Sequence, residues 1–478
     1  MTEPRARLDP ALPGILLLAF ALRAALCILY PDLEGRGDEP LHYVLGVLTA
    51  HLGADAIARW APGYEALLAA VFRLFGPDPN AARIVQVVLG TATVGGVYGL
   101  ARRAGGMRAG RLAGLLAATY PSLVAYVQYL YSETLFMFLL VAAVYTLHRS
   151  DGGPTRSEQV AAGVLLGLAA LTRAVVVYFL PLWLVVALAR RRPQEARAAA
   201  LVLAVALAVI APWSVRNAFH HGGFLLVDPT LGRTAYLAFN DVRFNRDLGL
   251  SERPGPLPER ARCPAPRVAG RAPLPPVAEL RALFPPVAER FTRIAGGTGA
   301  LIALARDEAA TDFAAVQRCE VRRALDFAVR KPGTVMQRSL ERVYAFWGPN
   351  SFLLRSVHQG VYRGGPLARA NFAGIEVVTV LAYLLVMGAA ILAFGRRELP
   401  RLFTWCLLFG AYYTGMHVLA VAYSRYRLPL LPLAIAVGAV WLADPRGARH
   451  RGRHAAALVA LILFLALSVH YVTTVLPR

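Results

Sequence analysis

Apolar runs long enough to cross a lipid bilayer recur from one end of this 478-residue chain to the other. A hydrocarbon core about 30 Å thick is crossed by roughly 20 helical residues. Charged residues make up 17% of the chain, against about a quarter in soluble proteins. The pattern predicts an all-α polytopic membrane protein and excludes a simple soluble enzyme. The clear runs are Leu12–Tyr30, Ile84–Ala101, Leu112–Val127, Leu135–Leu147, Ala198–Ile210, Val377–Phe394, Leu402–Ala422, Leu428–Leu442 and Ala455–Val475.

One apolar stretch, Val160–Ala189, is too long for a single crossing. At 1.5 Å per residue it would extend about 45 Å as one helix. We interpret it as two short helices broken at Thr172–Arg173, which gives a bundle of about eleven spans.

The net charge of +22 comes almost entirely from arginine, because Lys331 is the only lysine. The arginines gather in alternate short links, such as Arg102–Arg111, Arg190–Arg197 and Arg446–Arg453. This asymmetry follows the positive-inside rule and places those links and the N-terminus in the cytosol. It marks topology rather than a nucleic-acid-binding face, so no nucleic-acid partner is expected.

The sidedness leaves two long segments outside and divides the chain into three parts. Residues 1–212 form an N-terminal module of about seven spans that includes an external loop, 31–83, with two amphipathic surface helices. Residues 213–371 form an external segment, and residues 372–478 a C-terminal module of about four spans. In the external segment, 251–290 holds ten prolines and is predicted to be irregular or disordered, whereas 307–347 is predicted to be helical.

The four cysteines divide by location. Cys27 and Cys406 lie in spans and are expected to be packing residues. Cys263 and Cys319 share the external segment, where a disulfide between them is left open.

Carboxylates follow the first span at Asp38 and Glu39, just before Pro40. Either could cap a helix that starts at this proline. Asp38 and His42 also share one helix face, so a carboxylate there could act as a base. With Glu39, the same two residues could bind a divalent metal, Mg²⁺ or Mn²⁺; this is left open.

Further candidate site residues stand at external membrane boundaries. Arginine there runs against the positive-inside trend, and its forked guanidinium group matches phosphate oxygens. An acid at the edge of a span is costly unless solvated or paired. The predicted phosphate- or lipid-binding residues are Arg59, Tyr64, Arg173, Arg216, Arg425 and Arg427, and the predicted cavity residues are Tyr131 and Glu133.

These residues lie in short motifs whose order resembles the GT-C membrane glycosyltransferases. The likeness is to the bacterial family-39 type, which is similar to protein O-mannosyltransferases and to the aminoarabinose transferases that modify lipid A. One departure from the family pattern is Glu65, where a proline or small apolar residue normally follows the PGY motif. The motifs are Asp38–Glu39, Arg59–Tyr64 (RWAPGY), Ser132–Phe136 (SETLF), Gly167–Arg173 (GLAALTR), Pro212–Asn217 (PWSVRN), Arg342–Trp347 (RVYAFW) and Arg425–Pro429 (RYRLP).

The resemblance implies a GT-C-like bundle that transfers a sugar from a polyprenyl-phosphate carrier to a lipid, glycan or protein acceptor. The site would lie on the external face of the cytoplasmic membrane, with Asp38 as base and the arginines binding phosphate. Two other classes stay open: a lipid or polysaccharide transporter or flippase, and a surface-polysaccharide polymerase or ligase.

Overall fold

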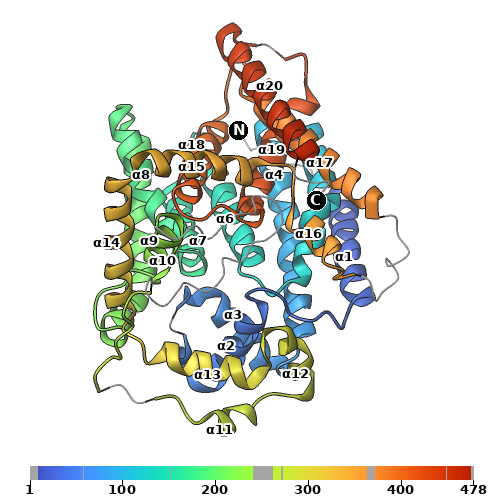
Figure 1. The fold of residues 1–478 in the computed structure, drawn as a ribbon. Coiled ribbons are helices and arrows are strands. Elements are labelled where there is room, and N and C mark those ends of the chain that lie inside the picture. Colours follow the sequence, from blue (N-terminus) through green and yellow to red (C-terminus); the bar gives the residue numbers. More distant parts are fainter. Residues whose placement is uncertain are drawn as a thin grey trace.

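The structure is a computed structural model that describes residues 9–474 except 58, 151, 241–261, 271–272, 363–371 and 448. Within these ranges the chain folds into helices with no β-strand (Figure 1). Six described helices are long and apolar enough to cross a membrane, which confirms the polytopic class. They are α1 (Ala11–Leu29), α4 (Pro79–Thr119), α9 (Pro193–His220), α17 (Phe372–Ala393), α19 (Leu431–Ala443) with η6 (Ser424–Leu430) before it, and α20 (Arg451–Thr474).

The other predicted spans also fall on helices, although the count of eleven is not established. The break predicted at Thr172–Arg173 separates α7 (Arg156–Thr172) from α8 (Val175–Ala189). The remaining two are α6 (Glu133–Leu147) and α18 (Arg401–Val418).

Helix α4 contains the second predicted span and the first part of the third, which continues beyond Thr119 into α5 (Pro121–Ala125). At Gly106 the backbone has φ 80°, a left-handed conformation that favours glycine. A Cβ on Gly110 would lie 2.8 Å from the Cβ of Arg102, so the chain doubles back at this point. The chain then continues through α5 toward α6.

The two predicted surface helices are present as α2 (Glu39–Leu52) and α3 (Pro62–Phe75). They do not lie as isolated amphipathic helices, because α2 is buried along nearly its whole length. A second core, formed with α3 and three external helices, surrounds it (Figure 1). Those helices are α11 (Val277–Arg281), α12 (Pro286–Thr292) and α13 (Thr298–Ala309).

This packing corrects the prediction of an irregular or disordered insert at 251–290. In its described part the near-repeats LPPVAE and FPPVAE each begin a short helix, α11 and α12. Proline is favoured at a helix start, where its missing N–H costs nothing. Leu280 and Phe291 are then buried in the second core. Residues 251–261 of the predicted insert lie outside the described residues.

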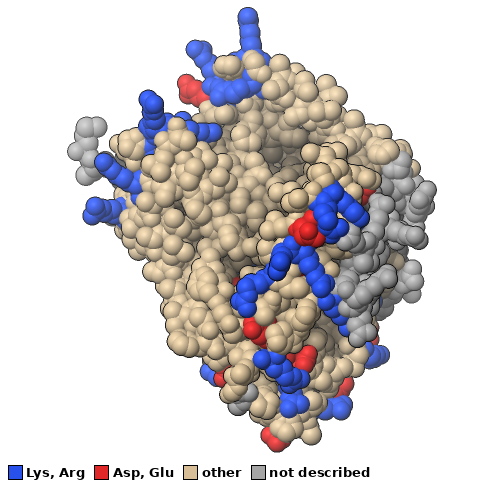
Figure 2. All heavy atoms as spheres, turned by 60° about the vertical axis from the view of Figure 1, so that its left-hand side comes forward, with Lys and Arg blue, Asp and Glu red and all other residues tan. Residues whose placement is uncertain are grey.

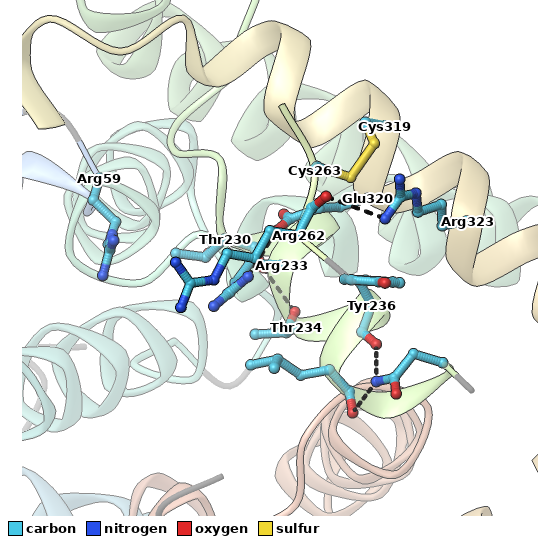
Figure 3. Close-up of polar contacts among 12 residues, drawn as sticks. Arg59, Thr230, Arg233, Thr234, Tyr236, Arg262, Cys263, Cys319, Glu320 and Arg323 are labelled. Atoms are coloured by element: carbon cyan, nitrogen blue, oxygen red, sulfur yellow. Dashed lines mark hydrogen bonds and ion pairs between the residues drawn. A yellow bond between two sulfur atoms is a disulfide. The ribbon is translucent and has the colours of Figure 1, made fainter. Parts of the chain in front are cut away.

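The rest of the external segment contains α10 (Thr230–Ala238), α14 (Phe313–Arg330), α15 (Pro332–Trp347) and α16 (Phe352–His358). The helix expected from Asp307 to Arg330 is divided between the end of α13 and α14. Cys263 and Cys319 form a disulfide that ties the insert to α14 (Figure 3). Cys27 and Cys406 are free thiols.

Candidate active site

The turn before α2 holds Asp38 at the rim of the bundle. Gly37 has φ 64°, and a Cβ there would lie 2.2 Å from the hydroxyl oxygen of Tyr131. Glycine is therefore required for this close approach. The Asp38 N–H points to the same hydroxyl at 3.4 Å, and that hydroxyl donates to the Arg36 carbonyl at 2.9 Å.

The Asp38 carboxylate does not cap α2, although its position allows it. Its Oδ2 instead accepts a hydrogen bond from Arg425 Nη2 at 2.8 Å, across 387 residues of sequence. The Asp38 side chain is 45% exposed and that of Arg425 is 13% exposed. The acid thus reaches solvent while its cation is held in the protein.

Aromatic rings hold the Arg425 guanidinium in place. It lies 5.0 Å from the ring centre of Tyr131 and 5.1 Å from that of Tyr426. Both contacts are within the range of cation–π attraction. The two rings therefore fix the Arg425 guanidinium, whose Nη2 donates to Asp38.

A second ion pair shares the Tyr426 ring. The Arg173 guanidinium lies 5.3 Å from that ring and pairs with Glu133 at 2.8 Å. It also donates to the Ser132 hydroxyl at 3.3 Å. The structure therefore brings together four predicted site residues, Asp38, Arg425, Arg173 and Glu133, around Tyr426 and Tyr131.

Glu39 has a different position from its neighbour Asp38. Its two carboxylate oxygens accept from the backbone N–H groups of Arg36 at 3.0 Å and Leu130 at 2.8 Å. The side chain is buried, and burial raises the pKa of Glu39 to about 7 against the two N–H groups, which lower it. Glu39 therefore joins the Asp38 turn to the segment before α6.

His42 and Glu65 form a buried pair beside the Asp38 turn. His42 Nδ1 lies 2.8 Å from Glu65 Oε1, and the imidazole packs on Trp60 with ring centres 4.1 Å apart. Tyr64 donates to Gln86 at 3.2 Å and is fully buried. The departure at Glu65 thus has a structural partner, and Tyr64 packs rather than faces the rim.

The predicted metal set Asp38, Glu39 and His42 is not assembled. Each of the three side chains has a different partner: Arg425, two backbone amides and Glu65. Among the described residues, no group of three His, Cys, Asp or Glu side chains could hold a metal ion. The residues present do not fit a chelated cation in this arrangement, so no chemical step is derived through one.

Two of the predicted phosphate-binding arginines have partners outside the Asp38 cluster. Arg59 pairs with Glu308 of α13 at 2.6 Å. Arg216 donates to the Ala54 carbonyl at 2.6 Å and lies over the Trp213 ring. Figure 3 shows Arg59 in the same region as Arg233 and Arg262.

Arg427 is buried and donates to backbone carbonyls at the end of α15. Its Nη1 donates to Phe346 at 2.7 Å and to Gly348, and its Nη2 to Asn350. This group fixes the chain between α15 and α16 and differs from the role predicted for it.

Two residues near the cluster were missed by sequence reasoning. Burial lowers the pKa of Arg355 in α16 to about 10, with a smaller contribution from the nearby charge of Arg425. Asp228 lies between α9 and α10; burial raises its pKa, against hydrogen bonds from Thr230 and the charge of Arg173, which lower it. In the sequence, each is a charged residue beside an apolar run. This pattern is too common to identify either one as a site residue.

Residues 60–215, about a third of the chain, match the dolichyl-phosphate-mannose-protein mannosyltransferase family. The resemblance drawn from the sequence is confirmed over this range, which includes Tyr131, Glu133 and Arg173. No curated protein sequence matches the chain.

Three solved structures are similar in fold. The oligosaccharyltransferase AglB of Archaeoglobus fulgidus, in complex with an inhibitory peptide and a dolichol-phosphate, has 15% identity and a TM-score of 0.47 over 96% of this chain and 55% of that one. ArnT of Cupriavidus metallidurans, bound to undecaprenyl phosphate, has 15% identity and a TM-score of 0.41 over 91% and 79%. The archaeal enzyme with Zn and sulfate has 14% identity and a TM-score of 0.42 over 95% and 52%. The chain thus spans about half the length of the archaeal protein.

Proposed function

We propose that this chain is a membrane glycosyltransferase of the GT-C type that moves a sugar from a polyprenyl-phosphate donor to a hydroxyl group on a lipid, glycan or protein acceptor. The observation that carries the proposal is the contact between the half-exposed carboxylate of Asp38 and the ring-held guanidinium of Arg425. The family match to dolichyl-phosphate-mannose-protein mannosyltransferases supports the donor class.

The reaction needs a base for the acceptor and a cation for the leaving group. Asp38 would take the acceptor hydroxyl proton as that oxygen attacks the anomeric carbon. The bond from the anomeric carbon to the phosphate oxygen breaks, and the oxygen keeps the electron pair. Arg425 and Arg173 would stabilise the growing phosphate charge, as preorganised cations do in a site that excludes water.

The ion pair between Asp38 and Arg425 also has a proposed role before the donor binds. A phosphate binds guanidinium in the same forked manner as a carboxylate, so the donor would compete with Asp38 for Arg425. Binding of the donor would then release Asp38 from the cation and raise its basicity. The base would thus be activated when the leaving group is in place.

The site is proposed to face the exterior of the cytoplasmic membrane. Two independent features support this side. The arginine-rich links lie at the opposite helix ends from Asp38, as the positive-inside rule expects. The Cys263–Cys319 disulfide lies in the segment whose helices pack on α2, and disulfides persist in oxidising compartments.

The test is donor consumption by purified protein, followed by mass spectrometry of the polyprenyl-phosphate sugars and of the product. Asp38→Asn should lower turnover at least about 100-fold, within the range of general base catalysis. Asp55→Asn is the matched control, since Asp55 lies in the same external loop, is exposed and pairs with His220. Equal turnover in wild type and Asp38→Asn would reject Asp38 as the base. Lipid movement without sugar transfer would favour a flippase, and a long glycan product a polymerase.

A further inference from the structure

A cavity of about 1670 Å³ opens at the opposite end of the bundle from Asp38. Helices α6 and α8 begin next to the Glu133–Arg173 pair, and each has 15 residues. Their far ends, Leu147 and the residues after Ala189, line the cavity. At 1.5 Å per residue, the cavity lies about 22 Å from the proposed active site. It is larger than the sites that hold drug-sized ligands, which are about 300–1,000 Å³.

The charged lining of this cavity is almost entirely cationic. Six arginines line it, and Glu195 is the one carboxylate among the lining residues. Glu195 is already engaged, because it accepts from Trp183 Nε1 at 3.2 Å and pairs with Arg192 at 3.4 Å. The arginines are Arg156, Arg190, Arg191, Arg192, Arg197 and Arg401.

Several of these donors lack an acceptor in the part of the chain that the structure describes. The side chains of Arg190, Arg191 and Arg197 have no carboxylate or hydrogen-bond partner among the described residues. Trp405 also lines the cavity, and its buried Nε1 has no hydrogen-bond acceptor within the described ranges. A lining rich in donors without a described acceptor suits a ligand that carries acceptors and negative charge, and a phosphate group is such a ligand.

The backbone at Arg191 adds an independent observation. Arg191 has φ 54° and is the one described non-glycine residue in the left-handed region. It ends α8 in a Schellman turn, in which the Arg192 N–H bonds the Ala187 carbonyl at 3.0 Å and the Arg191 N–H that of Leu188 at 2.9 Å. Glycine usually occupies this position, so the chain keeps a cation at the cavity rim despite backbone strain.

The apolar part of the lining indicates that the ligand carries hydrocarbon chains. Val160, Val186 and Leu408 line the cavity between the arginines. Next to them, Val185 and Leu188 of α8 are 59% and 60% exposed, as expected of a lipid-facing surface.

In Figure 2, basic side chains at the top of the view have almost no acidic neighbours, whereas those lower down are interleaved with acids.

We propose that this cavity binds the headgroup of a phosphate-bearing lipid from the leaflet opposite to the Asp38 site, with its chains lying along α8. Basic pockets between membrane helices on the cytoplasmic side bind anionic headgroups in this manner. The proposal is independent of the transferase activity, because none of its residues belongs to the Asp38 cluster.

The experiment measures quenching of tryptophan fluorescence in the detergent-purified full chain by phosphatidylglycerol with brominated chains. Trp183 and Trp405 line the cavity and place two fluorophores at the site. Phosphatidylglycerol should quench saturably, and phosphatidylcholine with the same brominated chains should not. Competition by unlabelled phosphatidylglycerol or by a polyprenyl phosphate supports a lipid site. Displacement by inorganic phosphate at equal concentration would overturn it in favour of a soluble anion.

Two sets of variants locate the site. The triple variant Arg190→Gln, Arg191→Gly, Arg197→Gln should weaken phosphatidylglycerol binding by about 100-fold, at about five-fold per arginine. The matched control, Arg446→Gln, Arg449→Gln, Arg451→Gln, removes the same charge from the link between α19 and α20, outside the cavity lining. An equal loss in the control would show general attraction to an anionic surface and overturn the proposal.

The single variant Arg191→Gly separates loss of binding from loss of the fold. It removes one cavity cation and relieves the left-handed strain, so the variant should melt at a higher temperature and bind phosphatidylglycerol about five-fold more weakly. Unchanged binding in both this variant and the triple variant would overturn the site.

Discussion

The two ends of helices α6 and α8 hold arginines in opposite ways. At the Asp38 end, Arg173 and Arg425 are largely buried, and each pairs with a carboxylate at 2.8 Å. At the other end, Arg190 and Arg197 are exposed and no described carboxylate pairs with them. A buried charge is costly unless an opposite charge in the protein pairs with it, whereas an exposed charge is solvated and can bind an anion from outside the protein. The first end therefore holds its cations in a fixed geometry, as the proposed chemistry requires, and the second leaves cations accessible to the proposed ligand.

The largest expected effect comes from breaking the buried pair at the first end. Arg173→Met leaves Glu133, whose side chain is 2% exposed, as a buried charge without its cation. The free energy of unfolding in mixed micelles should fall by about 3–5 kcal/mol. Arg173→Met with Glu133→Gln should recover most of this loss. If the single variant is as stable as wild type, the pair is not a buried ion pair.

The next effect concerns Glu39, a buried acid at the same end that has no ion pair among the described residues. Burial raises the pKa of Glu39 from 4.5 to about 7, so the folded state holds the proton longer than the unfolded state. Its contribution is complete below pH 4.5 and is lost as the pH rises to about 7, a total of about 3 kcal/mol.

Unfolding of wild type and Glu39→Gln should therefore be compared across this pH range. The variant should lack the decrease in stability that wild type shows between pH 4.5 and 7. Glu279→Gln, at an exposed position in α11, is the control and should follow wild type. A variant whose stability falls with pH as steeply as wild type would contradict the assignment.

A smaller effect of opposite sign is expected at the second end. Arg191→Gly replaces a left-handed arginine at φ 54° with the residue that this position favours. The variant should gain about 1 kcal/mol of stability, measured by thermal unfolding without added lipid. A loss of stability would mean that contacts of the Arg191 side chain stabilise the fold by more than the left-handed backbone destabilises it.

The smallest effect is expected for Arg190→Gln. The side chain is exposed and makes no described ion pair, so the free energy of unfolding should change by less than about 0.5 kcal/mol. A large loss would show that the two ends do not differ as described.

Much of the fold could be predicted because apolar length and arginine position are local signals. The predicted spans and the break at Thr172–Arg173 correspond to helices. The burial of α2 could not be predicted in this way, because it depends on short helices in the proline-rich insert that pack from more than 200 residues away.

The candidate site was predicted as a set of residues but not as a geometry. Asp38 and Arg425 were both singled out, yet only the fold shows that they touch across 387 positions. Arg425 and Arg427 are two residues apart in η6, where they point in different directions, one to Asp38 and one to backbone carbonyls. Sequence reasoning gave both the same role because it had no helix register for this short segment.

Binding of polyprenyl phosphate without its sugar distinguishes the role of Asp38 from that of Arg425 most directly. If Arg425 binds the phosphate and Asp38 acts only on the acceptor, Asp38→Asn should bind polyprenyl phosphate at least as tightly as wild type while sugar transfer is lost. Arg425→Met should bind it about 100-fold more weakly, the loss expected for a charge-assisted contact. Equal weakening of carrier binding by both variants would contradict the division of roles on which the proposed function depends.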